Sequence, residues 1–165
     1  MSKIEVLIIA LVIGVMGTLS GLAVMTARAH TRDITRLSQV REVQMGLEMY
    51  FQDHSAYPVS ADYTALGQAL TACLSADGFG APCSASGPTP YIEYVPTPPT
   101  AGLDGASGCD DVENAYCFIS GDEEYRIQFE LERSNSALNL EKGANCATEE
   151  GLKAGACSAL STATE

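Results

Sequence analysis

The chain has 165 residues, and 9 Lys and Arg stand against 21 Asp and Glu, which gives a formal net charge of −12 at pH 7. A chain of this length is one domain by default. The strong negative charge disfavours a nucleic-acid-binding surface, because the phosphate backbone would repel it. We therefore expect no nucleic-acid partner.

The first 27 residues contain a long apolar run. No charged residue occurs from Val6 to Ala27, and a membrane-spanning helix needs roughly 20 such residues. The run is too long for a signal-peptide core, and no small-residue cleavage site with a polar spacer follows it. We therefore expect a retained membrane-spanning helix. Glu5 lies at the edge of the run, where an ionisable group either flanks the span in the headgroup layer or has a partner.

The helix is predicted to continue from residue 28 to residue 53. Apolar residues recur there every three or four positions, at Ile34, Leu37, Val40, Val43, Leu47, Tyr50 and Phe51. This spacing places them on one face of a helix. A helix of some 50 residues would be roughly 75–80 Å long at 1.5 Å per residue. Because that exceeds the thickness of a membrane, its second half must project into water and pack against other elements.

The N-terminal arrangement resembles the type IV pilin family, which includes the pseudopilins of type II secretion. The matching features are Met1 as first residue of a processed chain, Glu5, the apolar run Val6–Met25, the amphipathic stretch 32–50, Asp53 and Tyr57-Pro58. The resemblance is specific over about the first sixty residues. Later fragments, at 124–132 and around Gly143, are similar to the sheet and tail of the major pseudopilin-like subgroup. Met1 and Leu22 depart from the pattern, since the family more often has Phe and Pro at these places.

The resemblance implies a structural subunit of a helical filament. Glu5 would pair with the N-terminal amine of Met1 in the next copy. The filament core would contain Val6, Leu7, Ile8, Leu11, Val12, Gly14, Gly17 and Gly21. The three glycines let membrane helices pack closely, and the resemblance adds that this segment loses helicity when it leaves lipid for the filament.

The resemblance also implies partners and a location. The partners are further copies of the chain, the inner membrane before assembly, a prepilin peptidase and the pilus assembly machinery. The terminus would be N-methylated, and the filament would lie at the cell surface. Two alternatives stay open: a type II secretion pseudopilin and, in another class, a monomeric membrane-anchored binding domain. A Glu5→Ala or Glu5→Gln change separates the classes, because only filament assembly requires the pairing.

The predicted fold class is α+β, with a membrane or filament-core half at 1–27 and a soluble region at 28–165. Residues 54–90 should connect helix and sheet and contain a short helix at 63–74, N-capped by Asp62. Strands are predicted at 91–95, 115–119 and 125–132, within an antiparallel sheet at 91–140. The last strand alternates cleanly, with Tyr125, Ile127, Phe129 and Leu131 on one face. Residues 141–165 should form a disulfide-stapled loop.

Two features disagree about the topology in the membrane. Arg28, Arg32, Arg36 and Arg41 follow the span and place this side in the cytoplasm by the positive-inside rule. All six cysteines also follow the span, as an even set typical of an oxidising compartment. We give the cysteines more weight and expect an extracytoplasmic soluble region. Among the 15 possible pairings, the short loops favour Cys73–Cys83, Cys109–Cys117 and Cys146–Cys157.

No catalytic motif is apparent, so we expect neither an enzyme nor a cofactor. His54 follows Asp53 without a nucleophile motif, and the sequence contains no phosphate-binding loop or metalloprotease helix. Asp104, Asp110, Asp111 and Glu113 offer oxygen ligands and form a weak candidate calcium site. They lack the spacing of an EF-hand, and a solvated acidic loop is the simpler interpretation. A zinc site is disfavoured, because no Cys-x-x-Cys occurs.

Overall fold

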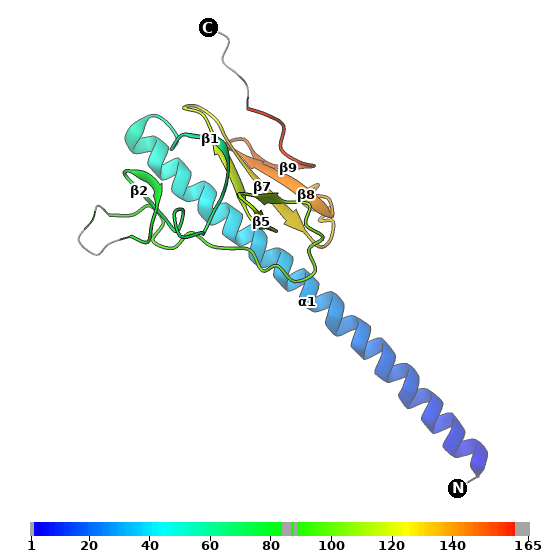
Figure 1. Ribbon diagram of the computed structural model, residues 1–165. Coiled ribbons are helices and arrows are strands. Elements are labelled where there is room, and N and C mark those ends of the chain that lie inside the picture. Colours follow the sequence, from blue (N-terminus) through cyan, green and yellow to red (C-terminus); the bar gives the residue numbers. More distant parts are fainter. Residues whose placement is uncertain (1, 84–86, 88, 161–165) are drawn as a thin grey trace.

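The computed structural model describes residues 2–83, 87 and 89–160. One long helix, α1 (Lys3–His54), carries a small antiparallel sheet on its C-terminal half, while its N-terminal half projects away from the rest of the chain (Figure 1). We call residues 3–27 of α1 the free half and residues 28–54 the packed half. The packed half and residues 55–160 together form the head. This is the predicted α+β class.

Both ends of α1 have recognisable caps. At the start, the side chain of Ser2 accepts a hydrogen bond from the Ile4 N–H, and Glu5 Oε2 accepts one from the Ser2 N–H at 2.8 Å. This reciprocal arrangement is a capping box. At the end, Ser55 adopts a left-handed conformation with φ of 56° and donates its N–H to the Phe51 carbonyl at 2.7 Å. The helix therefore ends one residue beyond the predicted position.

The main sheet has five antiparallel strands in the order β1-β6-β7-β8-β9. Their bounds are β1 Ser60–Ala65, β6 Cys117–Ser120, β7 Tyr125–Leu131, β8 Gly143–Thr148 and β9 Gly151–Ala154. Two small hairpins join β2 (Cys73–Ser75) to β3 (Gly78–Gly80) and β4 (Gly108–Cys109) to β5 (Val112–Glu113). Strand β7 is central, and its register with β8 runs from Arg126 opposite Thr148 to Leu131 opposite Gly143.

The core lies between the packed half of α1 and one face of the sheet. The predicted alternation in β7 is confirmed, because Tyr125, Ile127, Phe129 and Leu131 are all buried. Val40, Val43 and Leu47 of α1 are completely buried in the same cluster. Burying a side chain of this size contributes about 1.5–3 kcal/mol. The amphipathic half of the helix and the sheet thus stabilise each other.

The predicted short helix at 63–74 is wrong. The segment begins as strand β1, which pairs with β6, and ends at β2 after a series of turns. Gly67 has φ of 75°, and a Cβ there would lie 2.6 Å from Thr97 Cγ2, so the chain turns where a helix would have continued. The leucines at helical spacing do not share an environment, since Leu66 is buried and Leu70 is 78 % exposed.

Two further predictions need correction. Residues 91–95 do not form a strand of the main sheet; Ile92 only bridges to Leu74 of β2. Residues 141–165 were expected to be a loop, but the sheet continues there with the hairpin β8–β9. Strand β8 contains Gly, Asn and Cys, which give little strand signal, and its pairing with the hydrophobic β7 determines its structure.

The six cysteines form the three nearest-neighbour disulfides. Cys73–Cys83 closes the β2–β3 hairpin region, Cys109–Cys117 joins β4 to β6, and Cys146–Cys157 joins β8 to the segment after β9. The sequence separations are 10, 8 and 11 residues, so each bond closes a short loop. The bonds therefore fasten the periphery of the head to its sheet.

Candidate assembly interface

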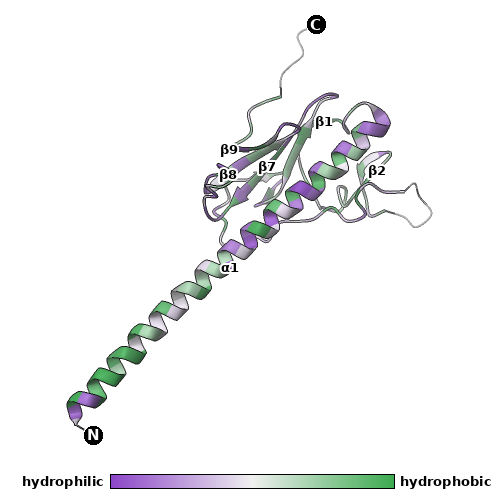
Figure 2. Ribbon diagram, turned by 180° about the vertical axis from the view of Figure 1, so that it is seen from behind, coloured by the Kyte–Doolittle hydropathy of each residue, from purple (hydrophilic) through white to green (hydrophobic). Residues whose placement is uncertain are grey.

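Within the described chain, the free half of α1 leaves its described side chains exposed and meets the head at its last turn, where Arg133 donates to the Thr26 carbonyl. None of the 18 residues in its most apolar stretch is buried, and by length and composition the helix is able to cross a membrane. In the ribbon of Figure 2, most of this half has the colours of hydrophobic residues, whereas hydrophilic and hydrophobic residues alternate in the packed half. Soluble monomers rarely expose so large a contiguous apolar surface. Such a surface is suited to contact with lipid or with another protein.

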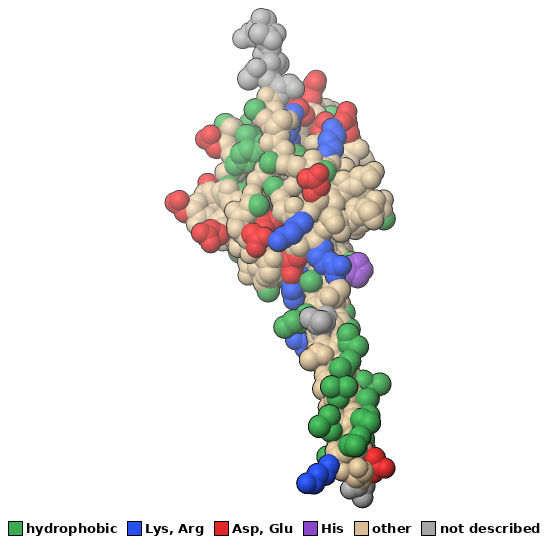
Figure 3. Space-filling model, turned by 90° about the vertical axis from the view of Figure 1, so that its right-hand side faces the viewer, with side chains coloured by type: hydrophobic (Ala, Val, Ile, Leu, Met, Phe, Trp, Pro, Cys, Tyr) green, Lys and Arg blue, Asp and Glu red, His purple; other side chains and the backbone are tan. Residues whose placement is uncertain are grey.

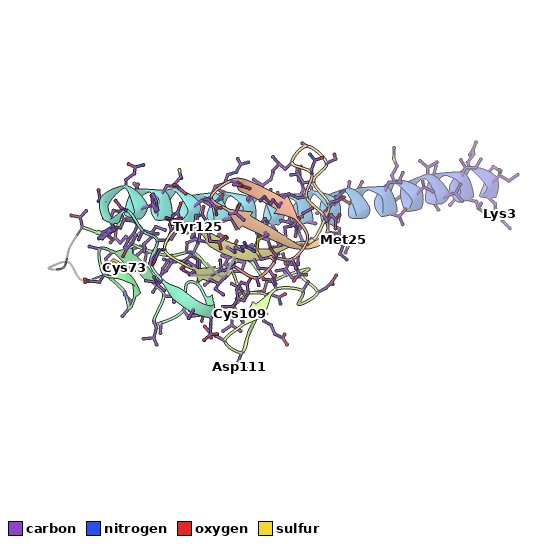
Figure 4. The ribbon with its side chains drawn as sticks, turned by 90° about the horizontal axis from the view of Figure 1, so that it is seen from above. Lys3, Met25, Cys73, Cys109, Asp111 and Tyr125 are labelled. Carbon is purple, nitrogen blue, oxygen red and sulfur yellow. A yellow bond between two sulfur atoms is a disulfide. The ribbon has the colours of Figure 1, made fainter. Side chains whose placement is uncertain are left out.

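The predicted core residues all belong to this exposed surface. Val6, Leu7, Ile8, Leu11 and Val12 are between 47 and 69 % exposed. At Gly14, Gly17 and Gly21, a Cβ would meet no atom within 4 Å. Side chains between Lys3 and Met25 point outward with no other element beside them (Figure 4). The glycines do not serve packing inside the chain, and any close approach they permit is to another molecule.

Glu5 already has a partner in its own chain. Its Oε2 accepts the Ser2 N–H at 2.8 Å, and its negative charge lies at the positive end of the helix dipole. Oε1 forms no hydrogen bond to another described residue, so the carboxylate can still accept from a second chain. Met1, the other member of the predicted pair, lies outside the described residues.

A buried cluster of ion pairs fixes the packed half of α1 to the end of β7. Arg32 donates two hydrogen bonds to the Glu132 carboxylate, each at 2.6 Å. Arg36, whose side chain is fully buried, contacts Asp33 Oδ1 at 2.7 Å and Glu132 Oε1 at 2.8 Å. The hydrogen bonds from Arg32 hold the pKa of Glu132 below its usual value; burial opposes this shift, and Arg36 reinforces it.

The same cluster holds the loop that follows the 91–95 segment. Arg36 donates to the carbonyls of Pro99 and Ala101. Asp33 accepts the backbone N–H groups of Glu132 at 2.9 Å and Arg133 at 3.1 Å. Buried charges are stable only when all their hydrogen-bonding groups are matched, as they are here. The cluster therefore sets the direction in which the free half leaves the head.

The sequence did not predict this ion-pair cluster, called here the joint between α1 and β7. Arg36 and Glu132 are 96 residues apart, and no local pattern connects them. One signal was available: Arg36 is four residues before Val40, on the helix face that the apolar spacing identified as buried. A charged residue on such a face requires a buried partner.

The candidate calcium site is not formed. Among the described residues, no three Asp, Glu, His or Cys side chains are placed to hold a metal ion. Asp104 pairs with Lys142 at 2.9 Å, and Asp110 accepts the Ala65 N–H at 2.9 Å. Asp110 and Asp111 both have positive φ and shape the turn between β4 and β5. These carboxylates organise loops instead of converging on one point.

No protein-family model matches the chain, and comparisons with curated proteins and with solved structures likewise found no match. The architecture of one long, partly apolar N-terminal helix followed by a small antiparallel sheet is compatible with a pilin-like protein.

Proposed function

We propose that the chain is the major structural subunit of a type IV pilus-like filament and polymerises through its free helix half. One observation carries this proposal: a single continuous helix buries one face against the sheet over its second half, whereas no residue of the most apolar stretch of its first half is buried. An anchor alone would require the apolar run, but it would not require a rigid extension from a precisely oriented head.

The free half would serve in two environments in turn. In the membrane-anchored pool, lipid would cover the apolar run. In the filament, the free halves of many copies would bundle at the axis and the heads would form the outer layer. The joint of Arg32, Arg36 and Glu132 supports this role, because every copy then holds its head at the same angle to its helix.

Glu5 would set the axial register of the copies. A carboxylate buried in a helix bundle is costly unless it is paired. Pairing with the N-terminal amine of the next copy removes that cost at one axial position only. In the isolated chain the Ser2 N–H donates a hydrogen bond to the Glu5 carboxylate, so Glu5 has a hydrogen-bond partner before assembly as well.

The disulfides support an extracytoplasmic head, since such bonds persist in oxidising compartments. This orientation opposes the positive-inside tendency of the arginines after the span. A basic leader, removed by a prepilin peptidase, would rebalance the charges. Three disulfides also suit a durable exposed pilus better than a secretion pseudopilus.

The test is a Glu5→Gln variant, expressed beside a Glu42→Gln control on the exposed surface of the same helix. Both variants should reach the membrane. Glu5→Gln should reduce the filament recovered from sheared cell surfaces at least about tenfold, the equivalent of 1.4 kcal/mol, while Glu42→Gln should not. Equal filament yields from the Glu5→Gln variant and the unmodified chain would contradict the proposal and favour a monomeric anchored domain.

A further inference from the structure

A groove lies where α1 enters the head. It has a volume of about 700 Å³ and runs between residues 23–37 of the helix and residues 131–137, which lead from β7 toward β8. We call this region the neck. Its walls combine apolar side chains such as Ala27 with polar side chains such as His30 and Arg133. The groove opens beside the start of the exposed apolar surface.

The length of the apolar run places the neck at a membrane surface. The 22 residues from Val6 to Ala27 extend about 33 Å at 1.5 Å per residue, and the hydrocarbon core of a bilayer is about 30 Å thick. When the free half spans the membrane, residues from 28 onward reach the headgroup layer. This step rests on the membrane-anchored state of the proposed function.

Arginine and histidine side chains lie on more than one side of the neck at that level. Arg28 and His30 are neighbours on α1, but they lie on different sides of the helix. Arg133 comes from the sheet side and donates to the Thr26 carbonyl at 3.5 Å. Figure 3 shows blue and purple side chains at the neck, between the hydrophobic rod and a head with many acidic groups. Two arginines, Arg28 and Arg133, on different sides of the neck at one level suit a planar anionic layer better than a one-sided protein contact.

The groove also offers unused hydrogen-bond donors. The hydroxyls of Ser134 and Ser136 form no hydrogen bond to another described residue, and Asn135 uses its side-chain oxygen, not its amide N–H groups, to bond Leu138. Asp33 lines the groove, but its negative charge is paired with Arg36. Its two oxygens also accept hydrogen bonds from two backbone N–H groups. A phosphate group needs several such donors beside a guanidinium.

We propose that the neck groove binds the headgroup of an anionic phospholipid while the chain is anchored in the membrane. Arg133 contacts the phosphate, and the hydroxyls of Ser134 and Ser136 donate to it. Ala23 and Ala27, which line the membrane side of the groove, pack against the apolar part of the same lipid. The bound lipid holds the head upright on the membrane until the free half leaves it.

The full chain is placed in bilayer nanodiscs with equal amounts of phosphatidylcholine and phosphatidylglycerol, extracted in mild detergent and examined by native mass spectrometry. Phosphatidylglycerol should be retained preferentially. Arg133→Gln should lower this preference about fivefold, as expected for one cation at about 1 kcal/mol. Arg41→Gln, an exposed change on the same helix above the neck, is the matched control and should change nothing. Unchanged near-ultraviolet circular dichroism establishes that both variants are folded.

Equal retention of the two lipids, or an equal preference in the Arg133→Gln variant, would overturn the proposal. So would a second copy of the chain cross-linked through the neck in place of lipid. The Glu5→Gln variant separates this inference from filament assembly, because it should lose filaments and keep the lipid preference. Filaments without lipid preference would end this inference alone, and failure of the chain to enter nanodiscs would end both.

Discussion

The two halves of α1 are one continuous helix with opposite surroundings. In the packed half, Val40, Val43 and Leu47 are completely buried against β7. In the free half, no residue of the most apolar stretch is buried. The same kind of apolar side chain therefore stabilises the fold in one half and contributes nothing to it in the other. Packing within the described chain therefore does not explain the apolar character of the free half.

The largest effect is expected at the joint between the halves. Arg36→Ala leaves Asp33 and Glu132 buried without their shared cation, and breaking such a cluster costs about 3–5 kcal/mol. Arg41→Ala, five residues along the same helix and exposed, should cost no more than about 0.5 kcal/mol. Chemical unfolding of the full chain in detergent micelles measures both. Similar values for the two variants would show that the cluster does not anchor the helix.

A matched pair of leucines tests the comparison itself. Leu47→Ala should destabilise the head by about 2–5 kcal/mol, because it removes a completely buried side chain from the core. Leu11→Ala removes the same atoms from the free half and should leave the unfolding transition of the head within about 0.5 kcal/mol. Near-ultraviolet circular dichroism of the tyrosines follows that transition. A large loss from Leu11→Ala would mean that the free half packs on the head.

Two glycines of α1 should respond in opposite directions. At Gly46 a Cβ would lie 2.4 Å from Ile92 Cγ1, a buried side chain that must move, so Gly46→Ala should cost about 1–3 kcal/mol by overpacking. At Gly17 the space is open, and Ala favours the helix by about 1 kcal/mol over Gly. Unfolding and far-ultraviolet circular dichroism measure the two effects. Equal changes in stability from Gly46→Ala and Gly17→Ala would show that the two glycines do not differ in packing.

The smallest expected effect is a dependence on pH. The pKa of Glu132 is lowered in the fold, mainly by hydrogen bonds from Arg32. Ionised Glu132 therefore stabilises the folded head, and this stabilisation is complete above the ordinary carboxyl pKa of about 4.3. This stabilisation of the folded head is lost as the pH falls from about 4.3 through the lowered pKa of Glu132 in the folded state. Glu132→Gln should weaken the head and flatten this part of the stability profile. The opposite slope, with stability rising as the pH falls, would contradict the assignment.

Periodic segments were predictable from the sequence, and the helix and β7 show why. The spacing of Val40, Val43 and Leu47 and the alternation from Tyr125 to Leu131 each reflect contact with one large partner surface. Strand β1 and the hairpin β8–β9 lack such a pattern, because their structure comes from pairing with β6 and β7. The ion-pair joint was missed for the same reason: its partners meet only once the sheet lies on the helix.

The most direct test of the proposed assembly is a helical reconstruction, by electron cryomicroscopy, of the filament that contains this chain. If the chain polymerises as proposed, residues Val6–Met25 of different copies contact one another around the axis, with Glu5 beside the N-terminus of a neighbour and the heads outside. A fibre held together by its heads, with these apolar residues facing solvent, would contradict it. Recovery of single anchored copies only, with no fibre from the producing cells, would contradict it equally.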